Sequence, residues 1–539
     1  MASKWWQQSV FYQIYPRSFQ DSNNDGIGDI KGITARLSYL EKLGIDAIWL
    51  SPVFASPNVD NGYDVSDYCA IMPEFGTMAD MEELIAAAKK AGIKIIMDLV
   101  VNHTSSEHPW FKKALAGDPH YKDYYIFRSD KNGLPNDLNS FFGGCAWEHL
   151  PATNEYYFHL FAKEQPDLNW ENPAVRKEVW KIMNFWLQKG VGGFRLDVIE
   201  LIGKIPDQKI IGDGPALHPY LQEMYREVLA GHDVVTIGET GSVTPLTAPL
   251  YTDPKRKELS MVFQFQHMAL DEVAKTSKWN LKSLNVSELK TVLSRWQTDL
   301  PKEAWNSLFW SNHDQPRILS RWGNVADYPT KSSKMLAILL HLMRGTPFIY
   351  QGEELGMTNQ YVDKISQLDD IESIHYYEEE KAKGSSEATI WQAINTKGRD
   401  NARTPMQWSN VPNAGFTGEN VTPWYNLNPN YTTINAQTRL DDPESIFYTY
   451  QKLIQLRKKY PLIVWGDYDL LDTAENIFAY TRSYEGETWL ICANFSDSKQ
   501  AVSLPYAATE TIITNYPHTY HHLNQLNLLP YETFVVKLA

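Results

Sequence analysis

Short apolar segments alternate with amphipathic segments along residues 8–355. Ile33, Leu37, Leu40 and Leu43 recur at helical spacing, and an apolar run follows directly after Gly44. A helix that passes through glycine into an apolar strand is typical of a βαβ unit. We predict eight such strands, at residues 10–15, 45–53, 93–101, 192–197, 234–239, 261–265, 308–314 and 347–351. Eight parallel strands with intervening helices predict a (β/α)8 TIM barrel.

Two regions depart from this alternation. Residues 104–170 follow the third predicted strand, are rich in aromatic and polar side chains, and contain no long helical face. From residue 466 the pattern changes to short alternating strands, predicted at 477–481, 488–494, 510–514 and 532–538. We therefore predict an α/β chain with a barrel domain (1–103 and 171–465), an irregular inserted domain (104–170) and a C-terminal antiparallel β domain (466–539).

The composition narrows the class of protein. The formal net charge of −15 argues against nucleic acid or an anionic membrane as a partner, because both select a basic surface. Three widely spaced cysteines fit neither a disulfide framework nor a thiolate metal site. With no visible secretory signal and no apolar run that could span a bilayer, we expect a cytoplasmic protein. The sequence leaves the oligomeric state open, and a monomer is compatible with it.

Three of the predicted strands end on a carboxylate: Asp197, Glu239 and Asp314. Parallel strands bring their carboxyl ends to one rim of a barrel, so these acids should gather in one site. Arg195 shares a strand face with Asp197 and would keep it ionised. One charged and one protonated carboxyl group are what glycoside hydrolysis requires. The structural alternative for any one of these acids is a helix N-cap.

Five motifs carry a resemblance to a known family. Residues 98–103 (DLVVNH), 193–197 (GFRLD), 238–239 (GE) and 312–314 (NHD) resemble, in order, the four main motifs of the α-amylase family, glycoside hydrolase family 13. Residues 165–170 (QPDLNW) resemble the fifth motif of its oligo-1,6-glucosidase and dextran glucosidase branch. The resemblance covers essentially the whole chain.

The resemblance implies roles for the matching residues. Asp197 would be the nucleophile and Glu239 the general acid/base, while Asp314 would bind the sugar's 2- and 3-hydroxyls. The family retains anomeric configuration through a covalent glycosyl-enzyme, which requires carboxyl groups about 5–5.5 Å apart. Further residues implied to contact the sugar or orient the acids are Tyr63, His103, Arg195 and His313.

The resemblance also implies that the substrate pocket is closed at one end. In related exo-acting enzymes an acid and an arginine pair and bind the terminal sugar, and we expect Asp60 and Arg403 to form this pair. The alternative is an ordinary salt bridge between loops. Lys278 and Glu372 occupy positions where relatives contact the next sugar.

Val198, directly after the predicted nucleophile, bears on linkage specificity. In this branch valine there accompanies α-1,6 cleavage and alanine accompanies α-1,4 cleavage. A stiff β-branched side chain would crowd an α-1,4 aglycone, whereas the extra methylene of an α-1,6 link swings the aglycone aside. The alternative is a packing residue that has no bearing on specificity. Relatives specialised on dextran carry tryptophan where this chain has Gly241, which leaves the preferred chain length open.

These inferences predict an exo-acting α-glucosidase that removes α-1,6-linked glucose from isomalto-oligosaccharides or dextran. Trehalose-6-phosphate hydrolysis, α-1,4-glucoside hydrolysis and sucrose isomerisation are alternatives on the same scaffold. The segment after Asp314 is a poor match to the arginine-rich loop expected of an isomerase. A non-catalytic transporter subunit is a further alternative, which the three retained acids oppose.

The segment 21–29 (DSNNDGIGD) resembles the first part of a calcium loop. Oxygen-bearing side chains fall at positions 1, 3, 5 and 9, with glycine at position 6 for the turn. The twelfth position is Gly32, so this is not a complete EF-hand. The resemblance implies a structural Ca²⁺ held by Asp21, Asn23, Asp25, Ile27 and Asp29. The alternative is a polar turn that its own side chains cap.

Overall fold

A closed parallel barrel forms the centre of the molecule in the computed structural model, which describes residues 4–539. Its strands are β1 (Phe11–Ile14), β2 (Ala47–Leu50), β5 (Lys94–Leu99), β9 (Gly193–Leu196), β10 (Val235–Glu239), β11 (Met261–Phe263), β12 (Ser307–Leu308) and β13 (Thr346–Tyr350). They pair in the order β11-β10-β9-β5-β2-β1-β13-β12, and a parallel bridge between Val262 and Asn306 joins the two ends. The predicted (β/α)8 class is confirmed.

The helices around the barrel begin and end at the expected signals. α4 starts after Thr77, whose side chain caps the helix in a capping box with Asp80, and α7 ends at the left-handed Gly190. The helices of the chain up to residue 298 are α1 (Trp5–Gln8), α2 (Ile30–Ala35), α3 (Leu37–Leu43), α4 (Met78–Lys90), α5 (Pro109–Leu115), α6 (Pro119–Lys122), α7 (Pro173–Lys189), α8 (Leu217–Met224), α9 (Ala248–Thr252) and α10 (Val286–Thr298). The later helices are α11 (Ile318–Trp322), α12 (Pro329–His341), α13 (Ile371–Lys383), α14 (Glu387–Lys397), α15 (Asp400–Arg403), α16 (Ala436–Asp441), α17 (Ile446–Lys459) and α18 (Pro461–Trp465).

The first predicted helical face is divided between two helices. α2 ends and α3 begins at Arg36, whose φ of −98° and ψ of 4° interrupt the helix. The Arg36 side chain donates to Gln20 Oε1 at 2.7 Å and its guanidinium lies 4.1 Å from the Trp408 ring centroid. These contacts with distant segments accompany a break that the apolar spacing alone did not predict.

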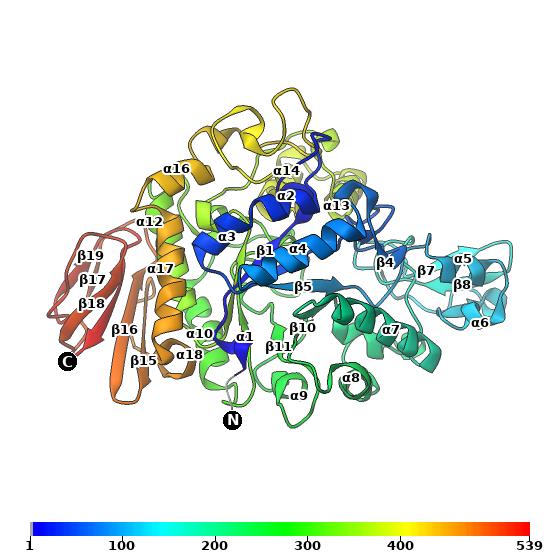
Figure 1. The fold of residues 1–539 in the computed structure, drawn as a ribbon, viewed down its shortest axis with the longest axis horizontal. Helices are drawn as coiled ribbons and strands as arrows, with labels where there is room; N and C mark the ends of the chain where they lie inside the picture. The colour runs from blue at the N-terminus through cyan, green and yellow to red at the C-terminus, as the bar shows by residue number, and fades with distance from the viewer. Residues whose placement is uncertain (1–3) are drawn as a thin grey trace.

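Two smaller units flank the barrel on opposite sides (Figure 1). Residues 104–170 contain α5, α6 and a small antiparallel sheet of β6 (Phe127–Ser129), β8 (Glu155–Phe158) and β7 (Trp147–Leu150). The C-terminal sheet has the order β14-β15-β16-β20-β18. Its strands are β14 (Asp467–Leu470), β15 (Ile477–Tyr484), β16 (Glu487–Asn494), β18 (Ala508–Thr514) and β20 (Thr533–Leu538), and the short pairs β17 (Gln500–Val502) with β19 (Leu526–Leu528) and β3 (Phe54–Ala55) with β4 (Asp67–Ile71) complete the strands.

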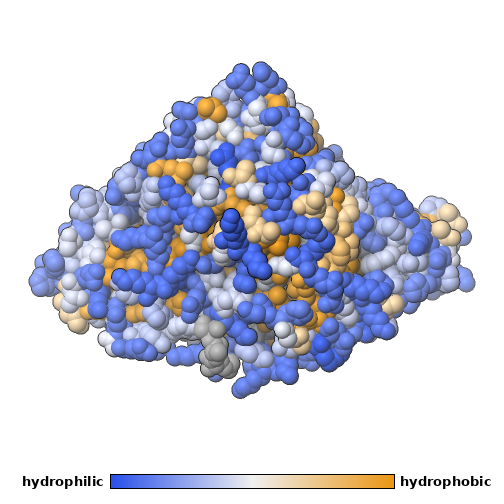
Figure 2. Space-filling view, viewed as in Figure 1, coloured by the Kyte–Doolittle hydropathy of each residue, from blue (hydrophilic) through white to orange (hydrophobic). Residues whose placement is uncertain are grey.

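The face of the molecule seen in Figure 2 is mostly hydrophilic, with apolar side chains in separate patches. Within residues 4–539, no helix combines the length and the apolar character that crossing a membrane requires.

Candidate active site

The three strand-tip acids reach the rim of the barrel by different routes. Asp197 follows β9 directly and Glu239 is the last residue of β10. Asp314 does not end a strand, because β12 stops at Leu308, and the prediction of a strand through residue 314 was wrong. The chain instead turns, with Asn312 Oδ1 accepting from the Asp314 N–H at 2.8 Å, and still delivers Asp314 to the same pocket.

Arg195 holds three carboxylates together. Its Nη1 lies 2.7 Å from Asp197 Oδ1 and 2.9 Å from Asp98 Oδ1, while Nη2 lies 2.6 Å from Glu239 Oε2. Asp98 also accepts from the Tyr63 hydroxyl at 2.9 Å and from Trp49 Nε1 at 3.0 Å. The predicted contact between Arg195 and Asp197 is present, and the same guanidinium also contacts the predicted acid/base.

The charge balance of this cluster favours one retained proton. Burial raises the pKa of Asp197 well above its usual range, and the charges of Glu239 and Asp98 add to this, while Arg195 opposes it. Burial likewise raises the pKa of Asp98 to about 6 against the opposing effect of Arg195. Because one buried cation faces three carboxylates, full ionisation of all three is costly. The expectation that Arg195 keeps Asp197 ionised is therefore not met by the arginine alone, because burial outweighs its effect on the pKa of Asp197.

The backbone at Val198 links the two acids. Val198 has a φ of 36° and a ψ of 41°, a left-handed conformation that a β-branched residue rarely adopts. In this conformation its N–H donates to Glu239 Oε2 at 3.0 Å. The turn directly after Asp197 therefore holds the carboxyl group of Glu239, and the Val198 side chain lines the pocket.

Asp314 lies among cations and neutral rings. Burial would raise the pKa of Asp314, but nearby positive charge outweighs it and holds that pKa well below its usual range: His313 contributes only in acid, where its ring is charged, and Arg399 and Arg403 contribute at every pH. Burial lowers the pKa of His313 to about 3, so its ring is neutral near pH 7. That ring stacks on Tyr63 with centroids 5.2 Å apart. The result is a permanently charged carboxylate beside neutral hydrogen-bonding rings.

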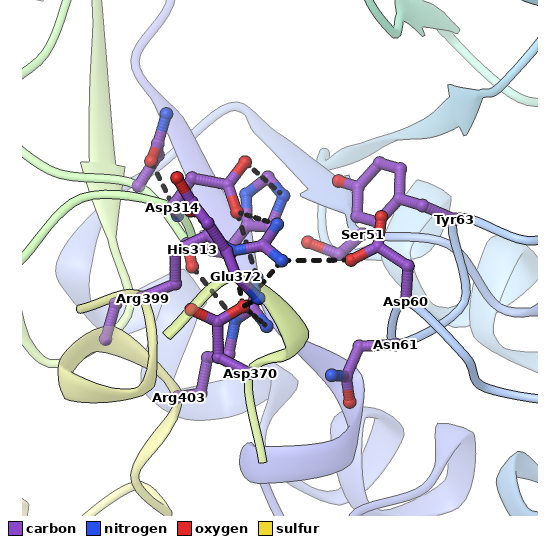
Figure 3. A network of polar contacts seen from close by, with 12 residues as sticks. Ser51, Asp60, Asn61, Tyr63, His313, Asp314, Asp370, Glu372, Arg399 and Arg403 are labelled. Carbon is purple, nitrogen blue, oxygen red and sulfur yellow. Dashed lines mark hydrogen bonds and ion pairs between the residues drawn. The ribbon is translucent and has the colours of Figure 1, made fainter. Parts of the chain in front are cut away.

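The ion pair predicted between Asp60 and Arg403 was wrong in its partner (Figure 3). Asp60 Oδ1 lies 3.1 Å from Nη2 of Arg399. The same guanidinium contacts Asp314 through Nη1 and Asp370 through Nη2. Arg403 instead contacts Asp314 Oδ1 at 2.9 Å and donates from Nε to the His313 carbonyl at 3.2 Å. Arg403 is the last residue of α15 and Arg399 precedes that helix, so the two side chains approach Asp314 from different places.

These groups line a pocket of about 210 Å³. Its walls contain the predicted residues Asp60, Tyr63, His103, Asp197, Val198, Glu239, Lys278, Asp314 and Glu372, together with Phe142, Phe161, Gln315 and Arg399. Lys278 and Glu372 form an ion pair with each other in the wall. A larger cavity of about 870 Å³ lies where the start of β10 meets Trp465, but none of the predicted site residues lines it.

Sequence reasoning missed four residues that support the pocket. Asp98 is the first residue of the motif at 98–103, but no function was predicted for it, although an acid within an apolar strand is a recognisable feature of the sequence. Gln165 donates to Asp60 Oδ2 at 3.2 Å and lies 3.2 Å from His103 Nε2. Gln13, on β1, lies 2.8 Å from His313 Nδ1. Nothing local marks Gln13. Arg399 lies in the same segment as Arg403, from which the pairing arginine was expected, and only the spatial contacts distinguish the two.

The predicted metal loop lies apart from the pocket, against residues 416–418. Asp21 accepts from the N–H groups of Asn23, Asn24 and Gly26 and from the Thr417 hydroxyl. Asp29 caps α2 through the Gly32 N–H at 2.6 Å. Among residues 4–539, no group of three or more His, Cys, Asp or Glu side chains is placed to hold a metal ion. The oxygen donors have the chemistry that Ca²⁺ prefers, but here each carboxylate binds N–H or hydroxyl groups of the protein.

Comparison with known proteins places the chain in a family. The alpha-amylase catalytic domain model matches residues 13–466, and the model of an alpha-amylase SusG C-terminal domain matches residues 477–535. The chain is 52% identical to a glucan 1,6-alpha-glucosidase of Streptococcus pneumoniae and 50% identical to an oligo-1,6-glucosidase of Parageobacillus thermoglucosidasius, each over 100% of both chains. The crystal structure of a Bacillus licheniformis trehalose-6-phosphate hydrolase matches with a TM-score of 0.95 at 45% identity over 100% of both chains. The chain belongs to the α-amylase family, glycoside hydrolase family 13.

Proposed function

We propose that this protein is a retaining, exo-acting α-glucosidase that hydrolyses α-1,6 links at the non-reducing end of isomalto-oligosaccharides and dextran. The observation that carries the proposal is one small pocket in which Arg195 holds Asp197 and Glu239, and Asp60 pairs with Arg399 in the wall. The names of the two full-length relatives point to the same activity.

The geometry supports a two-step reaction. Asp197 and Glu239 contact neighbouring nitrogens of one guanidinium, which suits the separation of about 5–5.5 Å found in retaining enzymes. Asp197 attacks the anomeric carbon while Glu239 protonates the departing oxygen. In the second step Glu239 takes a proton from water, the water oxygen bonds to the anomeric carbon, and the bond to Asp197 breaks, which releases glucose and restores the Asp197 carboxylate. Asp314 stays charged throughout and binds hydroxyl groups as the ring flattens.

Trehalose-6-phosphate hydrolysis is the second candidate, because a crystal structure of such an enzyme closely matches the fold. A phosphate group would need a cation that no protein carboxylate already neutralises. Both cations in the pocket wall, Lys278 and Arg399, are paired with acids. This arrangement favours a neutral sugar.

The decisive experiment compares substrates on the wild type and on Val198→Ala. We expect isomaltose to be hydrolysed faster than maltose and faster than trehalose-6-phosphate. Removing the branched side chain should lower the ratio of kcat/KM for isomaltose over maltose by about 10–100-fold, the range that one pocket contact supplies. A wild-type preference for maltose, or an unchanged ratio in the variant, would refute the specificity argument.

We also propose that residues 21–29 bind a structural Ca²⁺, supported by the oxygen-rich side chains of the loop. Asp21, Asn23, Asp25, Asp29 and the Ile27 carbonyl would hold it after the carboxylates release some of their N–H partners. A chelator should then lower the melting temperature, and added Ca²⁺ should restore it. Asp25→Ala should remove this response, and a melting temperature that the chelator does not change would exclude the site.

The cytoplasmic location remains a prediction.

A further inference from the structure

A short turn of the inserted domain forms one wall of the pocket. Phe142 lines the pocket, and its ring lies beneath the Arg399 guanidinium at 5.1 Å from centroid to Cζ. Phe161 packs against it with ring centroids 5.5 Å apart. Arg399 is the residue that pairs with Asp60, so the placement of Phe142 bears directly on the part of the wall that we propose closes around one glucose.

The turn is tied internally by Ser140. The Ser140 hydroxyl donates to the Phe161 carbonyl at 2.8 Å and accepts from the Phe142 N–H at 3.0 Å. Gly143 and Gly144 follow with φ values of 93° and 74°, both left-handed. These bonds make residues 140–144 a compact unit, but they do not attach that unit to the barrel.

The attachment comes from α13. His375 Nδ1 lies 2.9 Å from the Phe142 carbonyl oxygen, and because a carbonyl can only accept, Nδ1 must carry the proton. One helical turn later, Glu379 approaches so closely that a Cβ added at Gly143 would lie 2.6 Å from its Oε1. The same helix carries Glu372 in the pocket wall.

We propose that His375 is a positioning residue: it fastens the Phe142 turn of the inserted domain to α13 and thereby fixes the wall that supports Arg399. This inference rests on the proposed function for its kinetic consequence only. Without the bond, the Phe142 carbonyl loses its partner and the turn moves more freely, which weakens sugar binding without altering the acids. The expected signature is a change in KM with little change in kcat.

The test compares three variants by hydrogen exchange and by kinetics. His375→Ala should speed deuterium uptake by residues 139–145 and raise KM for isomaltose about three- to ten-fold, the range of one lost hydrogen bond, with kcat changed less than two-fold. His375→Asn places an amide donor near the position of Nδ1 and should restore both readouts. Glu378→Ala, an exposed position on the same helix, serves as the control and should match the wild type.

Two results would overturn the proposal. The first is a His375→Ala variant whose deuterium uptake and KM equal those of the wild type. The second is a loss of kcat in His375→Ala that His375→Asn does not restore. If the wild type instead prefers maltose or trehalose-6-phosphate, the proposed function fails. The role of His375 is still tested, because KM can be measured on the preferred substrate. The exchange of residues 139–145 still reports on the contact by itself.

Discussion

Two pairs of acids follow strand tips of the same barrel and have opposite surroundings. Asp197 and Glu239 face the pocket and share a buried arginine. Glu353 and Glu354 come shortly after β13 and do not line the pocket; they are buried, with exposed fractions of 7% and 0%. The difference shows that an acid at a strand tip does not by itself indicate catalysis.

Tyrosine hydroxyls bind the carboxyl groups of the second pair, and the nearby Arg317 acts on them only through its charge. Glu354 Oε1 accepts from the hydroxyls of Tyr12 and Tyr39 at 2.8 and 2.6 Å, and Glu353 Oε1 accepts from Tyr450 at 2.7 Å. Burial raises the pKa of Glu353 to about 8, with the charge of Glu354 adding to it. Glu353 is therefore mostly protonated at neutral pH. What separates the two pairs is an ion-pairing cation and access to a sugar.

The largest expected contrast is in activity. Asp197→Asn should lower kcat by about 10³-fold or more, as expected for loss of a nucleophile, whereas Glu353→Gln should stay within about two-fold of the wild type. A chromogenic α-glucoside assay measures both. The melting temperature of Asp197→Asn should not fall, because one fewer carboxylate competes for Arg195. Retained turnover in Asp197→Asn would reject its role as nucleophile. A folded but inactive Glu353→Gln would show that Glu353 is also needed for activity, which contradicts the proposed difference between the two pairs.

The next contrast is in stability against pH. An unfolded chain releases the Glu353 proton near its usual pKa of 4.5, whereas the folded protein holds it until the pKa of about 8. The folded state thus binds more protons in this window, and Glu353 removes stability as pH rises. Between pH 5 and pH 8 the loss should reach about 3 kcal/mol. In denaturant titrations, the free energy of unfolding of Glu353→Gln should increase relative to that of the wild type as pH rises. A difference in this free energy that does not change with pH would contradict the prediction.

The smallest expected effect is on substrate binding in acid. Burial raises the pKa of Asp60 to about 6, against the opposing effects of Arg399 and Arg403. As pH falls through 6, Asp60 takes a proton and its pairing with Arg399 weakens, so KM for isomaltose should rise several-fold. Asp60→Asn should have a raised KM that no longer varies between pH 5 and pH 7. A variant that keeps the wild-type KM profile would assign the titration to another group.

Much of the fold and the main acids could be predicted because their signals are local. Apolar spacing and the glycines that end helices identified the eight strands, and motif residues placed Asp197 and Glu239 at strand ends. Predictions failed where long-range contacts decide. Arg36 interrupts a continuous apolar face, and β12 stops at Leu308. The partner of Asp60 was misassigned because Arg399 and Arg403 lie in one short segment and differ only in where they point.

The sequence by itself determined the barrel, the C-terminal β domain and which acids meet in the pocket, because periodicity and motif spacing act within one segment of chain. Only the tertiary structure decided which charges meet. Arg195 binds carboxylates from β5 and from the ends of β9 and β10, and Arg399 joins Asp60 to Asp314 and Asp370. It also placed the Tyr450 hydroxyl against Glu353, with the Arg317 charge acting on that carboxyl group from nearby. Ion pairs depend on distances of a few ångströms between segments far apart in sequence, and folding sets those distances.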